Sequence, residues 1–278
     1  MSSDGSETAA NVKTQTFELR PRARAHPRAL PGEAAIDEMD ICNRVYAVLE
    51  RDRRINLHRH PISVSVGADG ILILEGEAES VAAKKLALRI ACAAAPELAG
   101  AADRLRVARA EPMSDGEIRD RVRDSLIGES SFADCGLRVR CDRSATVTVA
   151  EPAGYPPANI EVVVDDGVVT LSGRVPSLSH KRLAGVLTWW VPGTRDVIND
   201  LEVWPPEEDN DDEITSAVIL ALEKDPLVDA DQVHVLTRDR VVALSGIVAG
   251  AKQKEAAEDD AWCVFGVDQV MNRLAVLH

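Results

Sequence analysis

The chain has 278 residues, of which 45% are hydrophobic and only 3% aromatic, and its formal net charge is −14. This length suits two or three domains, and their cores must be built from aliphatic side chains because aromatic ones are scarce. The excess of acidic residues argues against nucleic acid as the main partner.

No targeting or membrane segment is recognisable in the sequence. The first residues lack the basic and apolar regions of a secretory signal, and no apolar run reaches the length of a membrane span. The five cysteines are odd in number and scattered, which indicates reduced thiols rather than a disulfide framework. We therefore expect a cytoplasmic protein that is at most peripheral at the inner membrane.

The N-terminal region differs from the rest of the chain. Residues 1–34 are rich in Ser, Ala, Thr and Pro and show no hydrophobic periodicity, so we expect a disordered tail. A basic, proline-interrupted run at 20–28 would attract an anionic surface only weakly.

Three predicted helices share one apolar pattern with residues at i, i+4 and i+8, which places the three side chains on one face. The three trios are Ile41, Val45 and Leu49; Ile118, Val122 and Leu126; and Ile214, Val218 and Leu222. Ser114 and either Asp211 or Asp212 are the expected N-caps of the second and third helices.

Each of these helices precedes a strand motif that the chain repeats. It reads Gly-Val-Val-Thr-Leu-Ser-Gly-Arg-Val at 167–175, recurs at 240–248 and is more divergent at 70–78. A glycine within each strand predicts a bulge or a close backbone approach; these glycines are Gly76, Gly173 and Gly246. A second apolar run and a short Asp/Gly turn predict a β-hairpin in the first and third copies. The middle copy has an insertion at about 130–160, with an added strand expected over 137–149.

A second helix and a third strand complete each repeat. A lysine lies eight residues and an alanine eleven residues after each strand glycine; these residues are Lys84, Lys181, Lys254, Ala87, Ala184 and Ala257. Two repeats then share a predicted C′ glycine and an asparagine in the last strand, namely Gly193, Gly266, Asn199 and Asn272. The first repeat has neither.

The order αββαβ predicts the α+β class, with three tandem two-layer domains and an extra strand and loop in the middle one. We place these domains at 35–109, 112–204 and 209–278.

The motif at 167–175, the lysine-bearing helix and the pattern Val-x-Gly-x-x-x-Val-x-Asn-x-Leu-x-Val at 191–203 resemble the BON (bacterial OsmY and nodulation) domain. This resemblance implies the αββαβ fold and a non-enzymatic role in binding phospholipid or envelope components, linked to osmotic stress or, in one branch, to potassium. BON domains often occur in periplasmic proteins. The absence of a signal departs from that pattern and leaves the inner membrane's cytoplasmic face or a soluble partner.

Catalytic and metal-binding motifs are missing from the sequence, so we expect no enzyme, no cofactor and no metal site. Ser179 and His180 are neighbours on a helix and point apart, which favours surface polar residues over a catalytic pair. His58, His60 and Cys42 offer too few convergent ligands for a metal ion.

The adjacent Trp189 and Trp190 are the candidate contact for lipid headgroups or a protein partner, together with the basic residues Arg51, Arg53 and Arg54. The alternative for the tryptophans is packing against the core or a neighbouring repeat. We expect three similar domains whose weak contacts with a phospholipid surface or a protein partner add through their linkage. The alternative function is sensing of a monovalent cation, such as potassium, that orders the repeats against each other.

Overall fold

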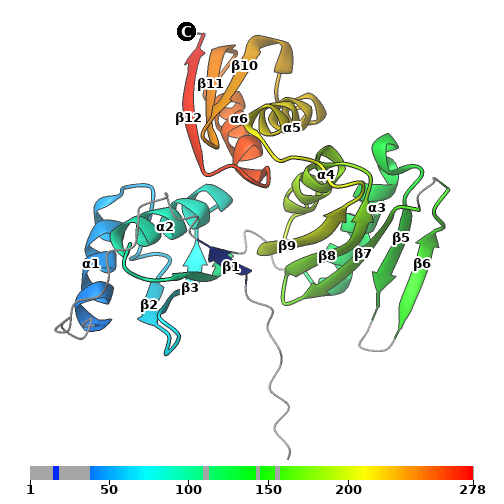
Figure 1. Ribbon diagram of the computed structural model, residues 1–278. Helices are drawn as coiled ribbons and strands as arrows, with labels where there is room; N and C mark the ends of the chain where they lie inside the picture. The colour runs from blue at the N-terminus through cyan, green and yellow to red at the C-terminus, as the bar shows by residue number, and fades with distance from the viewer. Residues whose placement is uncertain (1–14, 19–37, 109–112, 142–144, 154–156, 278) are drawn as a thin grey trace, which may run out of the picture.

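The computed structural model describes residues 15–18, 38–108, 113–141, 145–153 and 157–277. Their helices and strands fall into three units, each with its own sheet and two helices (Figure 1). The predicted α+β class is confirmed.

From α1 onward, the first unit has two strands before α2 and one strand after it. Its elements are α1 (Glu38–Arg51), β2 (Ile62–Val66), β3 (Ile71–Ala78), α2 (Val81–Ala94) and β4 (Gly100–Val107). β2 and β3 form the antiparallel hairpin, and β4 lies parallel to β3. Ile41, Val45 and Leu49 of α1 lie in the core of this unit, as predicted.

The second unit has the longest sheet because it contains the insertion. Its elements are α3 (Asp115–Gly128), the 3-10 turn η1 (Ser130–Phe132), β5 (Gly136–Arg140), β6 (Thr146–Ala150), β7 (Asn159–Asp165), β8 (Val168–Val175), α4 (Leu178–Trp189) and β9 (Asp196–Val203). The strand order is β6-β5-β7-β8-β9. The insertion therefore forms a hairpin of two strands, β5 and β6, where the sequence predicted one. Just beyond the two strands, the Cys141 amide donates to the Ala145 carbonyl at 2.9 Å.

The third unit repeats the simpler pattern with one small sheet. Its elements are α5 (Asp211–Lys224), the 3-10 turn η2 (Ala230–Gln232), β10 (Val233–Arg238), β11 (Val241–Val248), α6 (Ala251–Cys263) and β12 (Gln269–Val276). All nine residues of the three helix trios are at most 2% exposed, which confirms the predicted apolar faces. The N-cap of α5 is Asn210, whose side chain accepts from the amides of Asp212 and Glu213, and the prediction of Asp211 or Asp212 is wrong by one or two residues. The predicted cap Ser114 is confirmed and forms a capping box with Glu117.

The strand glycines occupy the same register in all three sheets. Gly76 pairs with Leu105, Gly173 with Leu201 and Gly246 with Leu274. At Gly246 φ is +131° and an added Cβ would lie 2.0 Å from the Gln232 carbonyl oxygen; the other two positions are equally tight. The predicted close approach of two backbones is confirmed. Gly193 and Gly266 also have positive φ, but they lie in the turns beyond the helix caps Trp190 and Val264 rather than at C′.

The first unit has one strand that the sequence did not predict. β1 (Gln15–Glu18) pairs antiparallel with β4 and extends the sheet to the order β1-β4-β3-β2. The prediction of a disordered tail over 1–34 is therefore wrong for these residues, because the open edge of β4 offers backbone donors and acceptors to any extended segment. The rest of that tail lies outside the described residues.

Candidate functional site at the junction of the three units

The C-terminal end of α6 and the turn that follows it accept hydrogen bonds from basic side chains of all three units. Lys85 of α2 donates through Nζ to the carbonyls of Trp262 and Val264, the latter at 3.1 Å. Arg182 of α4 donates through Nε to the Phe265 carbonyl at 3.0 Å, and Arg240 of the third unit donates to the Gly266 carbonyl at 2.9 Å. The last carbonyls of a helix lack partners within the helix and carry the negative end of its dipole. Lys85 therefore stabilises this helix end, and Lys85 and Arg182 join the first and second units to the third there.

Lys85 and Arg182 occupy equivalent positions in their units, nine residues after the strand glycine. Burial lowers the pKa of Lys85 to about 8, so its contact with the carbonyls has a substantial desolvation cost. Arg182 is only 1% exposed and forms an ion pair with Asp209 in the segment before α5. The same position of the repeat therefore joins both the first and the second unit to the third.

Trp189 and Trp190, the predicted contact for lipid, lie between the second and third units. Both are partly buried and pack against the cores of both units. The indole Nε1 of Trp190 donates to Oδ1 of Asp260 in α6 at 2.9 Å. The structure thus uses this pair for packing against a neighbouring repeat. Trp204, by contrast, is 50% exposed, and its ring lies 5.6 Å from the guanidinium carbon of Arg174.

A buried charge cluster joins the first unit to the second. Nζ of Lys84 lies 2.9 Å from Oδ2 of Asp103 and 3.1 Å from Oδ1 of Asp196. Arg106 binds Oδ2 of the same Asp196 at 2.7 Å. Burial raises the pKa of Asp196, and the charges of Lys84 and Arg106 oppose that rise. A backbone hydrogen bond of 2.7 Å from Val107 to Arg195 lies beside the cluster.

The cluster arises where the first unit departs from the other two. Asp103 pairs with Leu74, as Asn199 pairs with Leu171 and Asn272 with Leu244. The two asparagines are structural: each donates to the carbonyl of the helix lysine, Lys181 or Lys254, and accepts from the amide two residues later. A carboxylate in this position instead attracts the amine of Lys84. The sequence signal was a charged residue where the other repeats have asparagine.

The predicted basic residues lie at the end of α1 and just after it. Arg51, Arg53 and Arg54 are exposed. Arg54 pairs with Asp52 at 2.7 Å, and this hydrogen-bonded contact lowers the pKa of Asp52. Arg51 and Arg53 form no ion pair with another described residue. Figure 1 shows α1 on the outer side of the first unit, away from α4, so the structure does not bring the arginines and Trp189–Trp190 together.

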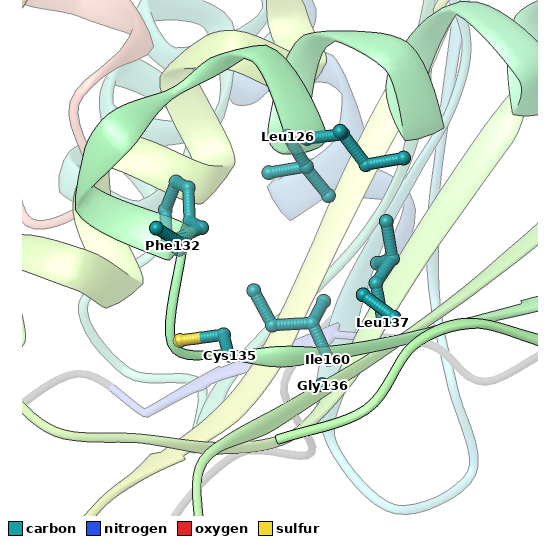
Figure 2. Close-up of a pocket in the computed structure, with 9 residues that line it drawn as sticks. Leu126, Phe132, Cys135, Gly136, Leu137 and Ile160 are labelled. Carbon is teal, nitrogen blue, oxygen red and sulfur yellow. The ribbon is translucent and has the colours of Figure 1, made fainter. Parts of the chain in front are cut away.

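A small apolar pocket of about 70 Å³, partly open to solvent, lies between α3 and the sheet of the second unit, beside the insertion. Figure 2 shows Leu126 of α3 and Phe132 of η1 facing Leu137 and Ile160 of the sheet, with Cys135 beside them. Burial raises the pKa of the Cys135 thiol, so the reactive thiolate is disfavoured. The pocket fits a few methylene groups or water molecules and offers no polar group that would orient a substrate.

The remaining candidate residues have local structural contacts. His180 bonds through Nδ1 to the Ser177 hydroxyl at 2.7 Å and through Nε2 to the Ser131 carbonyl at 3.1 Å, and burial lowers its pKa. All five cysteines are free. Within the described ranges, no three His, Cys, Asp or Glu side chains are grouped so that they could hold a metal ion. No helix in the same ranges combines the length and apolar character needed to cross a membrane.

Comparison with known proteins places two matches in the second and third units. The BON domain family model matches residues 149–205 and 210–277. The family model is thus found twice, in the part of the chain from 149 to 277. The first match begins inside β6, after most of the insertion, whereas the second begins at the N-cap of α5.

One relative and two solved structures add to this comparison. Osmotically-inducible protein Y of Escherichia coli (strain K12) is 36% identical over 122 residues, which cover 42% of this chain and 61% of the relative. The matched part therefore spans less than two thirds of that relative's length. Two structures of CdsD, a structural protein of the type III secretion system of Chlamydia trachomatis, have 14% identity and a TM-score of 0.22. They cover 87% and 86% of this chain, and 100% and 92% of their own.

Proposed function

We propose that the chain is a non-enzymatic binding protein, related to osmotic stress and associated with the cell envelope. The proposal rests first on the two BON domain matches and on the similarity to an osmotically inducible protein. Its proposed place of action is the cytoplasmic face of the inner membrane.

The proposal includes a third, divergent BON-like domain at 35–109, beside those at 112–204 and 209–278. Two observations support it. The first unit repeats the pairing of strand glycine and leucine found in the other units. In addition, Lys84 donates to the Leu105 carbonyl at 2.6 Å, as Lys254 donates to the Leu274 carbonyl at 2.7 Å.

In this proposal the three domains act as one preassembled body. The charge cluster around Asp196 and the cations at the end of α6 fix the domains relative to each other. Contacts that a partner makes with separate domains then add without a further cost for ordering them. The tryptophan pair contributes to this assembly by holding the second and third domains together.

The proposed partner is an anionic phospholipid surface. The observation that carries this choice is the exposed pair Arg51 and Arg53, which forms no ion pair with any other described residue. In a chain of net charge −14, such a local basic surface is the part that an anionic headgroup would meet favourably. Each arginine near an anionic membrane contributes about 1 kcal/mol, so the pair contributes about 2 kcal/mol.

Flotation with vesicles of phosphatidylglycerol and phosphatidylcholine tests this proposal. We expect salt-sensitive binding to the anionic vesicles, and about 30-fold weaker binding for the Arg51→Ala, Arg53→Ala variant. The control is Arg121→Ala, Arg238→Ala, which removes the same charge from exposed positions in the other two domains. Equal loss in both variants, or no binding by the parent protein, would contradict the proposal. The alternative, potassium sensing, predicts instead that potassium raises the unfolding temperature and sodium does not.

A further inference from the structure

A buried carboxyl group at the contact between the second and third units has one oxygen without a partner. Asp260 of α6 is 3% exposed. Its Oδ1 accepts from Trp190, but its Oδ2 has no hydrogen-bond partner among the described residues. A buried, unsatisfied carboxylate oxygen is costly, so the site favours either a proton or a move into water.

The side chain of Asp225 lies against this carboxyl group. Asp225 is the C-cap of α5, and its carboxyl group is close enough to that of Asp260 to raise the pKa of Asp260. Two carboxylates this close cannot both be ionised without strong repulsion. The end of α5 adds the negative end of its helix dipole.

Among the described residues, no cation is a main influence on the pKa of Asp260. α4 contributes the neutral indole of Trp190, and α6 contributes another acid, Asp259, and the thiol of Cys263. The neighbouring cations are engaged elsewhere; these are Lys85 with the carbonyls of Trp262 and Val264, Arg182 with Phe265 and Asp209, and Lys224 with Glu129. Burial first, and then the charge of Asp225, raise the pKa of Asp260 to about 8.

We propose that Asp260 and Asp225 form a proton-operated latch between the second and third units. With one proton shared by the two carboxyl groups, Trp190 and Asp260 remain in contact and the latch is closed. When the proton is lost, the negative charge of the buried Asp260 is repelled by that of the half-buried Asp225. Asp260 then gains solvation by moving away from Trp190, and this contact opens. Lys224 and Glu129, 2.9 Å apart, still join the two units.

The direction of the pH effect follows from the raised pKa. The closed latch keeps its proton up to about pH 8, whereas an exposed aspartate loses its proton near pH 4. Between these values the closed state binds more protons than the open one, so closing weakens as the pH rises. The closing equilibrium constant falls by up to tenfold for each pH unit in this interval and stays low above it.

Nuclear magnetic resonance of the tryptophan side chains in the full chain tests the latch directly. The indole N–H signal of Trp190, assigned through Trp190→Phe, should move between pH 6 and 10 with a midpoint near pH 8. Asp260→Asn keeps an acceptor for the indole and cannot ionise, so its Trp190 signal should stay in the closed position throughout. Far-UV circular dichroism verifies that the variant is folded.

Two further variants distinguish the latch from a general effect of charge. Asp259→Asn removes an equal charge from the exposed neighbour on α6, and its transition should persist. Asp225→Asn removes the charge that faces Asp260, and its midpoint should fall by at least one pH unit. The proposal is overturned if the parent protein shows no transition, or if Asp260→Asn retains it with the same midpoint. None of these outcomes depends on binding to lipid.

Discussion

Lys84→Met tests the buried cluster that joins the first and second units. The lysine is 4% exposed, and its amine binds Asp103, Asp196 and the Leu105 carbonyl. Removing one partner of a buried ion pair costs about 3–5 kcal/mol because the other charge stays buried. Arg106 still binds Asp196, so we expect the lower end, a loss of about 3 kcal/mol in the free energy of unfolding. Urea unfolding at pH 7.5, followed by circular dichroism, measures this loss.

The chain provides a matched control in Lys254→Met. Lys254 has the same position in the third unit, but among the described residues its amine donates only to the Leu274 carbonyl, at 2.7 Å, and forms no ion pair. Losing this hydrogen bond should cost about 1 kcal/mol. If the two variants lose equal stability, the ion pairs of Lys84 with Asp103 and Asp196 add no stability, and the reasoning is refuted.

The loss of unfolding free energy in Lys84→Met should also depend on pH. Burial already raises the pKa of Asp196, and without Lys84 that pKa rises further. A folded state with a raised aspartate pKa is destabilised at high pH and recovers as the pH falls and the group takes up a proton. We therefore expect a larger loss at pH 8 than at pH 5. An equal loss at both pH values would contradict this account of the cluster.

Two further predictions concern the third unit. Gly246→Ala should lower the free energy of unfolding by more than about 3 kcal/mol, because its Cβ would overlap the Gln232 carbonyl. The control Gly250→Ala places its Cβ in open space and should change that free energy by at most about 1 kcal/mol. Urea unfolding compares the two variants. Burial would raise the pKa of Glu129, but hydrogen bonds from Lys224 and Ser131 outweigh this effect and hold it at about 2. The stability that Glu129 contributes is present above about pH 4.5 and is lost as the pH falls towards 2, so Lys224→Met should move acid unfolding to higher pH. An unchanged acid midpoint would contradict that assignment.

The repeated elements could be predicted because their signals are local. Apolar residues at i, i+4 and i+8 define a helix face without knowledge of the partner, and a glycine in a β-branched strand indicates a close approach at that point. β1 was missed because four residues carry no periodicity and its pairing with β4 is distant in sequence. The insertion hairpin was predicted as one strand because both of its strands alternate in the same way.

The contacts between units could not be predicted in the same manner. Lys85 and Arg182 bind backbone carbonyls more than 80 residues away, and a carbonyl leaves no signature in the sequence. The tryptophan pair indicated an amphipathic contact, but the pattern could not distinguish a neighbouring repeat from a lipid surface. Asp103 was readable as a charge in place of asparagine, although Asp196, the second carboxylate that binds Lys84, was not.

The central claim is that the three units form one body joined at the end of α6. Small-angle X-ray scattering of the full chain at pH 7 tests it most directly. The account predicts a scattering curve that fits one fixed arrangement of the units, and a larger radius of gyration for Lys85→Met, Arg182→Met. Scattering from the parent protein that requires independently moving units would contradict the claim.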